Sequence, residues 1–264
     1  QAIMTSLDAS TSPPEAVFTS NVDLFYNTME SMAPGAWDLN LGLQDLWHMI
    51  SGSQYSWVLP DNFHACIETK TKVLIPFKFM DNDYAVPTKV DGRPEFHKGL
   101  GPNLIHSVDG MVVREMYRRC MYDPQVIARV EHAIAYPQVG RPGKSAEIVM
   151  DLWDHYKNTG FLSVRILDHL YQDTITLVDA QIITNLIASM PGKPFQLVSV
   201  HDCFRCHPNY GNDLRRQYNT IMADINDSNL LNSMCCQVAN KKIKTKKYGK
   251  IERSKILEAN YMLA

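Results

Sequence analysis

The run LVSVHDCFRCH, in the C-terminal part of the chain, brings together several side chains that could do chemistry. Cys203, Cys206 and His207 have the spacing at which a c-type haem is attached, and the same side chains are potential zinc ligands. His201 and Asp202 are another candidate, because they directly follow an apolar run that is typical of a buried strand. A carboxylate held at a strand end is an oxygen ligand of the kind that Mg²⁺ prefers.

The rest of the chain favours neither haem nor zinc. A c-type haem needs an oxidising compartment and an axial ligand, and the sequence signals neither. Zinc needs four convergent ligands, so one of Cys235 and Cys236 would have to join Cys203, Cys206 and His207. Cys235 and Cys236 are adjacent in the sequence, and adjacent cysteines make poor co-ligands. We therefore expect no haem and no zinc, and the cysteines are expected to be reduced thiols.

Composition and hydropathy indicate a globular protein. The chain has 264 residues, of which 45% are hydrophobic and 20% charged, enough to bury one large core or two modest ones. No apolar run approaches the roughly 20 residues that span a bilayer. The first residues lack the basic and apolar regions of a secretory signal. These features predict a cytoplasmic protein without a membrane partner.

Positive charge is concentrated near the end of the chain. Residues 236–264 carry eight Lys or Arg and two Glu, which leaves the remainder at −8 of a total of −2. Clustered lysines bind nucleic-acid phosphates with a strong dependence on salt. The alternative is a solvated basic segment. The lysines in question are Lys241, Lys242, Lys244, Lys246 and Lys247.

Periodicity predicts mainly helices, with a few strands. Ser12 and Pro13 are typical of a helix start, and Phe18, Val22, Phe25 and Met29 then share one helical face. Further predictions are a helix over 38–52, paired strands at 71–79 and 84–90, and a helix from a Gly-Pro turn at 101–102 to 120. Residues 121–190 are predicted to be mostly helical with a break at 139–144, and 194–200 to form a buried strand. A last helix is predicted after 211, capped by Asn212 or Asp213, with one apolar stripe made of Leu214, Tyr218, Ile221, Met222 and Ile225.

The predicted helix up to residue 120 carries its own polar motif. Val108, Val112, Met116 and Cys120 fall on one face of this helix. His106 and Asp109 lie on another face beside Gly110, and a glycine inside a helix costs about 1 kcal/mol relative to alanine. A close approach to the backbone would explain this glycine.

Three blocks occur in a fixed order: HKGLGPNLIHSVDG at 97–110, LVSVHDCF at 197–204 and ILEANYMLA at 256–264. They resemble the C-terminal third of the bacteriophage-type single-subunit DNA-directed RNA polymerases, which include the mitochondrial enzymes. In that family a PNxxHSxDG segment precedes the palm hairpin HDSF, and the chain ends in a foot similar to ILESDFAFA. AIMTSLDAS at 2–10 is similar to the end of the fingers helix called motif B.

The resemblance implies a mostly helical α+β fold: a fingers and palm fragment of a right-hand polymerase, with a palm β-hairpin and a C-terminal foot. The implied parts are 1–96 as the fingers region with the end of motif B, 97–120 and 191–235 as palm elements, 121–190 as an inserted helical segment, and 236–264 as the basic segment and foot. The connection from the first palm element to the hairpin is much longer here than in the family, which is why an insertion is expected.

By the same resemblance, Asp202 is a Mg²⁺ ligand, and His201 positions the RNA 3′ end or supports the hairpin. Nucleotidyl transfer by two metal ions needs carboxylates that bridge both ions, so one aspartate is insufficient. Nothing in the chain matches the family's motif A aspartate or its DxxGR segment. The expected function is Mg²⁺-dependent RNA synthesis from NTPs on a DNA template, with the two ions shared with a partner subunit that carries both missing parts.

Such a division resembles the split, two-subunit phage RNA polymerases of enterobacterial podoviruses, whose smaller subunit this chain of 30.0 kDa matches in size. It would act in transcription of the phage genome inside the infected bacterium. An enzyme without its own promoter-reading domain would need a single-stranded template or a recruitment factor that binds single-stranded DNA.

Other residues acquire roles only through the resemblance. His106 would contact the RNA–DNA hybrid, Ser107, Asp109 and Gly110 would hold that helix end, and the lysines of 241–247 would meet backbone phosphates. A capping or buried histidine is the alternative for His106. The remaining implied positions are Gln1, Thr5 and Asp8 at the incoming nucleotide, and Tyr261 and Ala264 in the foot.

Two other classes of function stay open. The first is a non-catalytic subunit that assembles with a polymerase or binds template. Asp8, where the family has Tyr, favours it, and the intact His201-Asp202 pair argues against it. The second is a magnesium-dependent nuclease or phosphohydrolase, which would need several clustered carboxylates that the sequence does not show.

Overall fold

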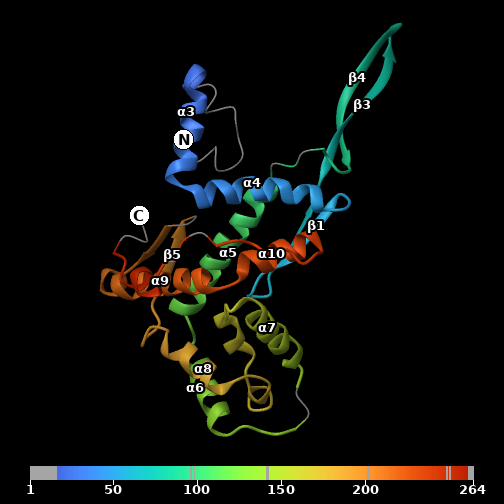
Figure 1. Ribbon diagram of the computed structural model, residues 1–264. Coiled ribbons are helices and arrows are strands. Elements are labelled where there is room, and N and C mark those ends of the chain that lie inside the picture. Colours follow the sequence, from blue (N-terminus) through green and yellow to red (C-terminus); the bar gives the residue numbers. More distant parts are fainter. Residues whose placement is uncertain are drawn as a thin grey trace. The chain divides into compact units, whose positions relative to one another are not determined.

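The computed structural model describes residues 17–95, 97, 99–140, 143–200, 203–247, 249 and 251–260 (Figure 1). Within these residues the protein is a mostly helical α+β structure whose strands form two-stranded sheets. The α-helices are α3 (Val22–Met32), α4 (Pro34–Met49), α5 (Leu100–Cys120), α6 (Pro124–Ala135), α7 (Ala146–Thr159), α8 (Ala180–Ala188), α9 (Gly211–Asp227), α10 (Leu230–Ala239) and α11 (Arg253–Leu257).

Short 3₁₀ helices and strands complete the described elements. The 3₁₀ helices are η1 (Thr19–Asn21), η2 (Val164–His169), η3 (Ile175–Leu177) and η4 (Pro208–Tyr210). The strands are β1 (Gln54–Val58), β2 (His64–Glu68), β3 (Lys70–Phe79), β4 (Asn82–Asp91), β5 (Leu197–Val200) and β6 (Cys203–Cys206), paired β1–β2, β3–β4 and β5–β6. The chain forms two compact units: the first comprises the residues up to 57, 64–106 and 234–248, and the second comprises 58–63, 107–233 and those from 249 on.

In the first unit, the predicted N-terminal helical face is confirmed over its described part. Phe18, Val22 and Phe25 are the more covered positions of their turns, Met29 is buried, and the rings of Phe18 and Phe25 stack with centroids 4.7 Å apart. The predicted start at residues 12 and 13 lies outside the described residues. The predicted end of the next helix at Gly52 is wrong, because α4 already ends at Met49 and the backbone becomes extended at Ile50.

The long β3–β4 hairpin of the first unit confirms the predicted strand pair (Figure 1). The strands are antiparallel over their whole length, from the Lys70–Asp91 pair to the Phe79–Asn82 pair. Met80 and Asp81 form the two-residue connection and both have positive φ, 48° and 61°. Two positive φ values are what a type I′ turn requires, and this turn matches the natural twist of two antiparallel strands.

In the second unit, the helical segment from α6 to α8 has a hydrophobic core of its own. Val130, Val149, Ile166, Leu170 and Ile183 are members of this core, and none of them exposes any surface. The predicted break at 139–144 lies between α6 and α7, as expected.

This segment leaves and rejoins the rest of the second unit at neighbouring points. The Tyr122 hydroxyl, just before α6, donates a hydrogen bond of 2.8 Å to the carbonyl of Pro191, just after α8. The Phe195 amide donates one of 2.7 Å to the carbonyl of Cys120. The two ends of the helical segment are therefore fixed next to each other.

Two details of the predicted C-terminal elements are wrong. The strand predicted over 194–200 is shorter and only half covered: Leu197 is buried, whereas Val198 and Val200 expose 57% and 53% of their surface. This strand belongs to a two-stranded pair, so only one of its faces meets the rest of the unit. Neither Asn212 nor Asp213 caps the next helix, because α9 already begins at Gly211 and both residues lie in its first turn. The apolar stripe predicted for α9 is confirmed.

Candidate functional site

The candidate site of the second unit is built on the β5–β6 hairpin. Val200 pairs with Cys203, so His201 and Asp202 are the two residues that separate the strands in the sequence, and both lie outside the described residues. Ser199 and Phe204 pair on the more covered face of the hairpin. The predicted roles of His201 and Asp202 stay predictions, and the geometry that can be given is that of their support.

Helix α5 provides that support, and it is the helix that carries the HSxDG motif. The Tyr117 hydroxyl on α5 lies 3.0 Å from Ser199 Oγ, and the amide of Ser199 donates a hydrogen bond of 3.1 Å to the same hydroxyl oxygen. Since both bonds end on one rigid aromatic side chain, the position of β5 relative to α5 is fixed by side chain and backbone together. The helix that carries the HSxDG motif and the strand that leads into His201 and Asp202 are therefore joined through Tyr117.

A largely apolar hollow lies between the same elements. It is lined by Val108, Asp109, Val112 and Val113 of α5, Phe204 of β6, and Tyr218, Met222 and Ile225 of α9. Phe204 also packs against the ring of Tyr218, with centroids 6.1 Å apart. These contacts hold the covered face of the β5–β6 hairpin in place. Asp109 is the acidic residue among those that line the hollow.

The described positions of the HSxDG motif all lie on α5. His106 is exposed, so the alternative of a buried histidine is wrong. The predicted Gly-Pro turn is also wrong, because α5 begins at Leu100 and takes Pro102 into its first turn, where no helical partner exists for the missing N–H. At Gly110, an added Cβ would come within 3.4 Å only of Arg114 Nη1 among the described residues. The flexible end of that side chain can move, so no part of the described chain requires a glycine here.

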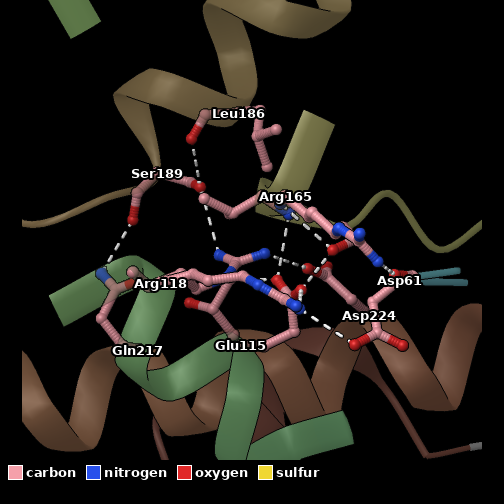
Figure 2. Close-up of polar contacts among 12 residues, drawn as sticks. Asp61, Glu115, Arg118, Arg165, Leu186, Ser189, Gln217 and Asp224 are labelled. Atoms are coloured by element: carbon pink, nitrogen blue, oxygen red, sulfur yellow. Dashed lines mark hydrogen bonds and ion pairs between the residues drawn. The ribbon is translucent and has the colours of Figure 1, made fainter. Parts of the chain in front are cut away.

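The sequence analysis missed a network of buried charges at the centre of the second unit (Figure 2). Asp61, whose side chain is 1% exposed, accepts two hydrogen bonds from Arg114, at 2.6 and 3.1 Å, and one of 3.0 Å from Arg118. Burial raises the pKa of Asp61, but the hydrogen bonds and charges of the two arginines outweigh burial and hold that pKa below its ordinary value.

Glu115 is the second carboxylate of the network, and its side chain is fully buried. It accepts hydrogen bonds from the Ser163 hydroxyl, from the Val164 amide at 3.0 Å and from Arg118 at 3.1 Å. Arg119, 1% exposed, lies 3.8 Å from it. The carboxylate thus joins α5 to the start of η2.

The same network reaches Arg253, just before the predicted foot, and a neighbouring asparagine of α9 holds the first residues of the foot itself. Asp224 on α9 lies 3.5 Å from Arg119 and 2.6 Å from Arg253 of α11. Asn219, also on α9, donates hydrogen bonds of 3.2 and 2.9 Å to the carbonyls of Leu257 and Ala259. These bonds tie the last described residues to the helix that follows the β5–β6 hairpin.

One signal in the sequence could have revealed part of this network. The run REMYRRC places Arg114 and Arg118, and likewise Glu115 and Arg119, four residues apart on a helix, where side chains meet. Arg114, Arg118 and Arg119 lie on a helix that also has a buried apolar face, so some of their charges must be balanced by buried carboxylates. The distance of 53 residues between Arg114 and Asp61 hides which carboxylate supplies them.

One thiol of the haem-like and zinc-like pattern, that of Cys206, lies in an environment that disfavours metal binding. Burial, followed by the negative charge of Asp213, raises the pKa of Cys206. Metal binding requires thiolates, so raised pKa values oppose it. Among the described residues, no three His, Cys, Asp or Glu side chains gather as they would around a metal ion.

The remaining predicted site residues divide into two groups. Lys241, Lys242, Lys244, Lys246 and Lys247 are described and exposed, on a segment anchored by the Ile243 amide, which donates to Cys236 Sγ at 3.1 Å. Gln1, Thr5, Asp8, Tyr261 and Ala264 lie outside the described residues.

No helix within the described residues is both long enough and apolar enough to cross a membrane.

The comparisons with known proteins assign no family. A scan against protein-family models finds no match for the chain, and a search of the curated proteins finds no matching relative.

Proposed function

We propose that this chain is one subunit of a heterodimeric DNA-directed RNA polymerase, whose active site is completed by a partner subunit. The observation that carries the proposal is the hydrogen bonding of Tyr117 with Ser199, which joins the HSxDG helix to the strand that leads into His201 and Asp202. In the polymerases that the sequence resembles, these two motifs belong to one palm. A pair of strands separated by two residues is also a suitable support for a metal-binding carboxylate.

In this proposal the residues of the chain bind and orient the reactants. Asp202 supplies one carboxylate, and an aspartate of the partner supplies the other that two Mg²⁺ ions require. When bound, the ions lower the barrier by activating the RNA 3′ hydroxyl and stabilising the charge on the leaving pyrophosphate. His106, exposed on α5, contacts the hybrid, and His201 positions the RNA 3′ end.

The donor chemistry of the chain agrees with magnesium and with a shared site. An aspartate oxygen is a hard ligand suited to Mg²⁺, whereas the neighbouring Cys206 thiol is disfavoured as a thiolate. Asp61, Glu115 and Asp224, the acidic members of the buried network, are already paired with arginines. They are therefore poor substitutes for a second metal-binding carboxylate, and the partner is the expected source.

The test is RNA synthesis by the co-purified complex on single-stranded DNA in the presence of Mg²⁺ and NTPs. Asp202→Asn is expected to lower the rate by on the order of 10³-fold or more, because a lost metal ligand removes several kcal/mol of transition-state stabilisation. Asp213→Asn is the matched control, since Asp213 pairs with Arg216 on α9 and should leave the rate unchanged.

Two results would contradict the proposal. Full activity of the Asp202→Asn complex would remove the residue from catalysis and favour a non-catalytic subunit. RNA synthesis by the chain without any partner would contradict the shared active site.

A further inference from the structure

The β3–β4 hairpin of the first unit has two chemically distinct faces. Cross-strand pairing places Val73, Ile75, Phe77, Phe79, Tyr84 and Val86 on one side, which we call the apolar hairpin face. This side of the two strands has no charged residue, and its other members are Thr71, Thr88, Val90 and Asn82. Phe77 and Tyr84 stack across the strands with centroids 5.5 Å apart.

The apolar hairpin face is uncovered in the described part of the protein. Its six named residues keep between 41% and 57% of their surface exposed. An antiparallel pair with one apolar and one charged face normally packs the apolar face against a core. A two-stranded hairpin by itself is also only marginally stable in water. Both arguments indicate a missing packing partner.

Charge distinguishes the class of that partner. Lys70, Lys72, Lys78 and Lys89 all lie on the opposite face, where Lys70 and Lys78 pair with Asp91 and Asp83 at 3.8 and 3.9 Å. Binding of a nucleic-acid backbone depends on Lys and Arg directed at phosphates. The apolar hairpin face offers none, so its chemistry suits an apolar protein surface.

The exposed area is sufficient for a specific contact. The aromatic members of the face, Phe77, Phe79 and Tyr84, belong to a class of side chain that buries about 150–250 Å² each, and the three aliphatic members are smaller. With about half of each residue exposed, the six residues present on the order of 500 Å². A partner of matching area would bring the total to about 1,000 Å², the size that a specific interface needs to reach. The hairpin can thus be a main element of one interface.

We propose that the apolar hairpin face docks onto an uncharged apolar surface of the partner subunit that completes the active site. This inference rests on the proposed function, which requires such a partner to be held stably. Docking of a second copy of this chain would cover the same face but would leave the active site incomplete. One contact with the partner subunit covers the exposed face and also retains the missing carboxylate.

The experiment compares two hairpin variants in binding to the co-purifying partner chain. Ile75→Thr/Phe77→Thr removes apolar surface but retains strand propensity, and neither side chain supports a buried core. Leu74→Thr is the matched control, because Leu74 is 66% exposed in the same strand but on the opposite face, in the uncharged middle between the lysines. The dissociation constant of each is measured with purified partner, together with thermal unfolding of the free chain to confirm folding.

The double variant should bind the partner about 100-fold more weakly or worse, as loss of central aromatic anchors does, while Leu74→Thr binds like the wild type. At a partner concentration that saturates the wild type but not the double variant, amide hydrogen exchange across β3 and β4 should slow in the complexes of the wild type and of Leu74→Thr, and not in the double variant. RNA synthesis by the double variant should recover at saturating partner concentration.

Unchanged affinity of the double variant would overturn the inference. It would also be overturned if the double variant lost only self-association of this chain, or only affinity for DNA. Failure of the proposed function looks different: the Asp202→Asn complex keeps full activity, while the affinity difference between the hairpin variants persists.

Discussion

Replacing Glu115 by Gln is expected to destabilise the second unit strongly. The side chain is fully buried, and its carboxylate faces Arg118 and Arg119, of which Arg119 is only 1% exposed. Gln keeps the shape and can still accept a hydrogen bond, but it removes the negative charge. Removing one member of a buried ion pair costs about 3–5 kcal/mol, because the remaining charge is left uncompensated in a medium of low polarity.

This cost is a large part of the stability of a domain, which is about 5–15 kcal/mol. For a chain of this size the melting temperature should fall by about 6–20 °C. The assay is urea and thermal unfolding followed by far-ultraviolet circular dichroism. Asp154→Asn is the control, since Asp154 pairs with Lys157 on α7 with both side chains largely exposed, and such pairs contribute about 1 kcal/mol or less.

A double-mutant cycle with Arg119→Met makes the reasoning sharper. If Glu115 and Arg119 stabilise each other, the double variant loses less stability than the sum of the single variants, by about 0.5–3 kcal/mol. Equal, small losses for Glu115→Gln and Asp154→Asn, or strict additivity in the cycle, would refute the description of this network as a coupled buried unit.

Two further predictions concern the ends of the same network. Because the pKa of Asp61 is lowered in the folded protein, its contribution to stability is complete above the ordinary value of 3.8 and is lost as the pH falls through the lower folded value. The free energy of unfolding should therefore decline more steeply below pH 3.8 in the wild type than in Asp61→Asn, as acid titration of unfolding would measure. Asn219→Ala should cost about 1–3 kcal/mol and speed amide exchange over 257–260. Thr220→Ala is the control, since the Thr220 hydroxyl donates only a bond within α9, to the carbonyl of Arg216, and this variant should leave exchange over 257–260 unchanged. Equal exchange in both variants would contradict the anchoring.

Local patterns predicted the elements that depend on local physics. The alternating patterns at 71–79 and 84–90 around MDND predicted the hairpin, and the helical spacing of Val112, Met116 and Cys120 predicted the buried face of α5. In both cases the pattern of one stretch determines which side chains share a face. The sequence could not predict that the apolar side of the hairpin stays exposed, because exposure depends on what packs there.

The features that were missed depend on contacts between distant residues. Asp61 meets Arg114 across 53 residues, and Tyr117 meets Ser199 across 82. The order of the motifs in the chain predicted which residues to consider, but not that a tyrosine outside every motif joins two of them. Likewise, the largely apolar run PFQLVSV suggested a buried strand over 194–200, although a two-stranded pair covers only one face.

The two ends of the helical segment from α6 to α8 are adjacent, which suggests that the segment can be deleted without separating the residues on either side of it. Tyr122 and Pro191 are already in hydrogen-bond contact, so a short linker would close the gap after excision. The buried network prevents a simple excision, because Ser163 and Val164 of the segment supply two of the hydrogen bonds to Glu115. A shortened chain would have to replace Glu115 and Arg119 by apolar residues at the same time. If the segment began as an independent inserted module, its hydrogen bonds to Glu115 would have made it a required part of the second unit.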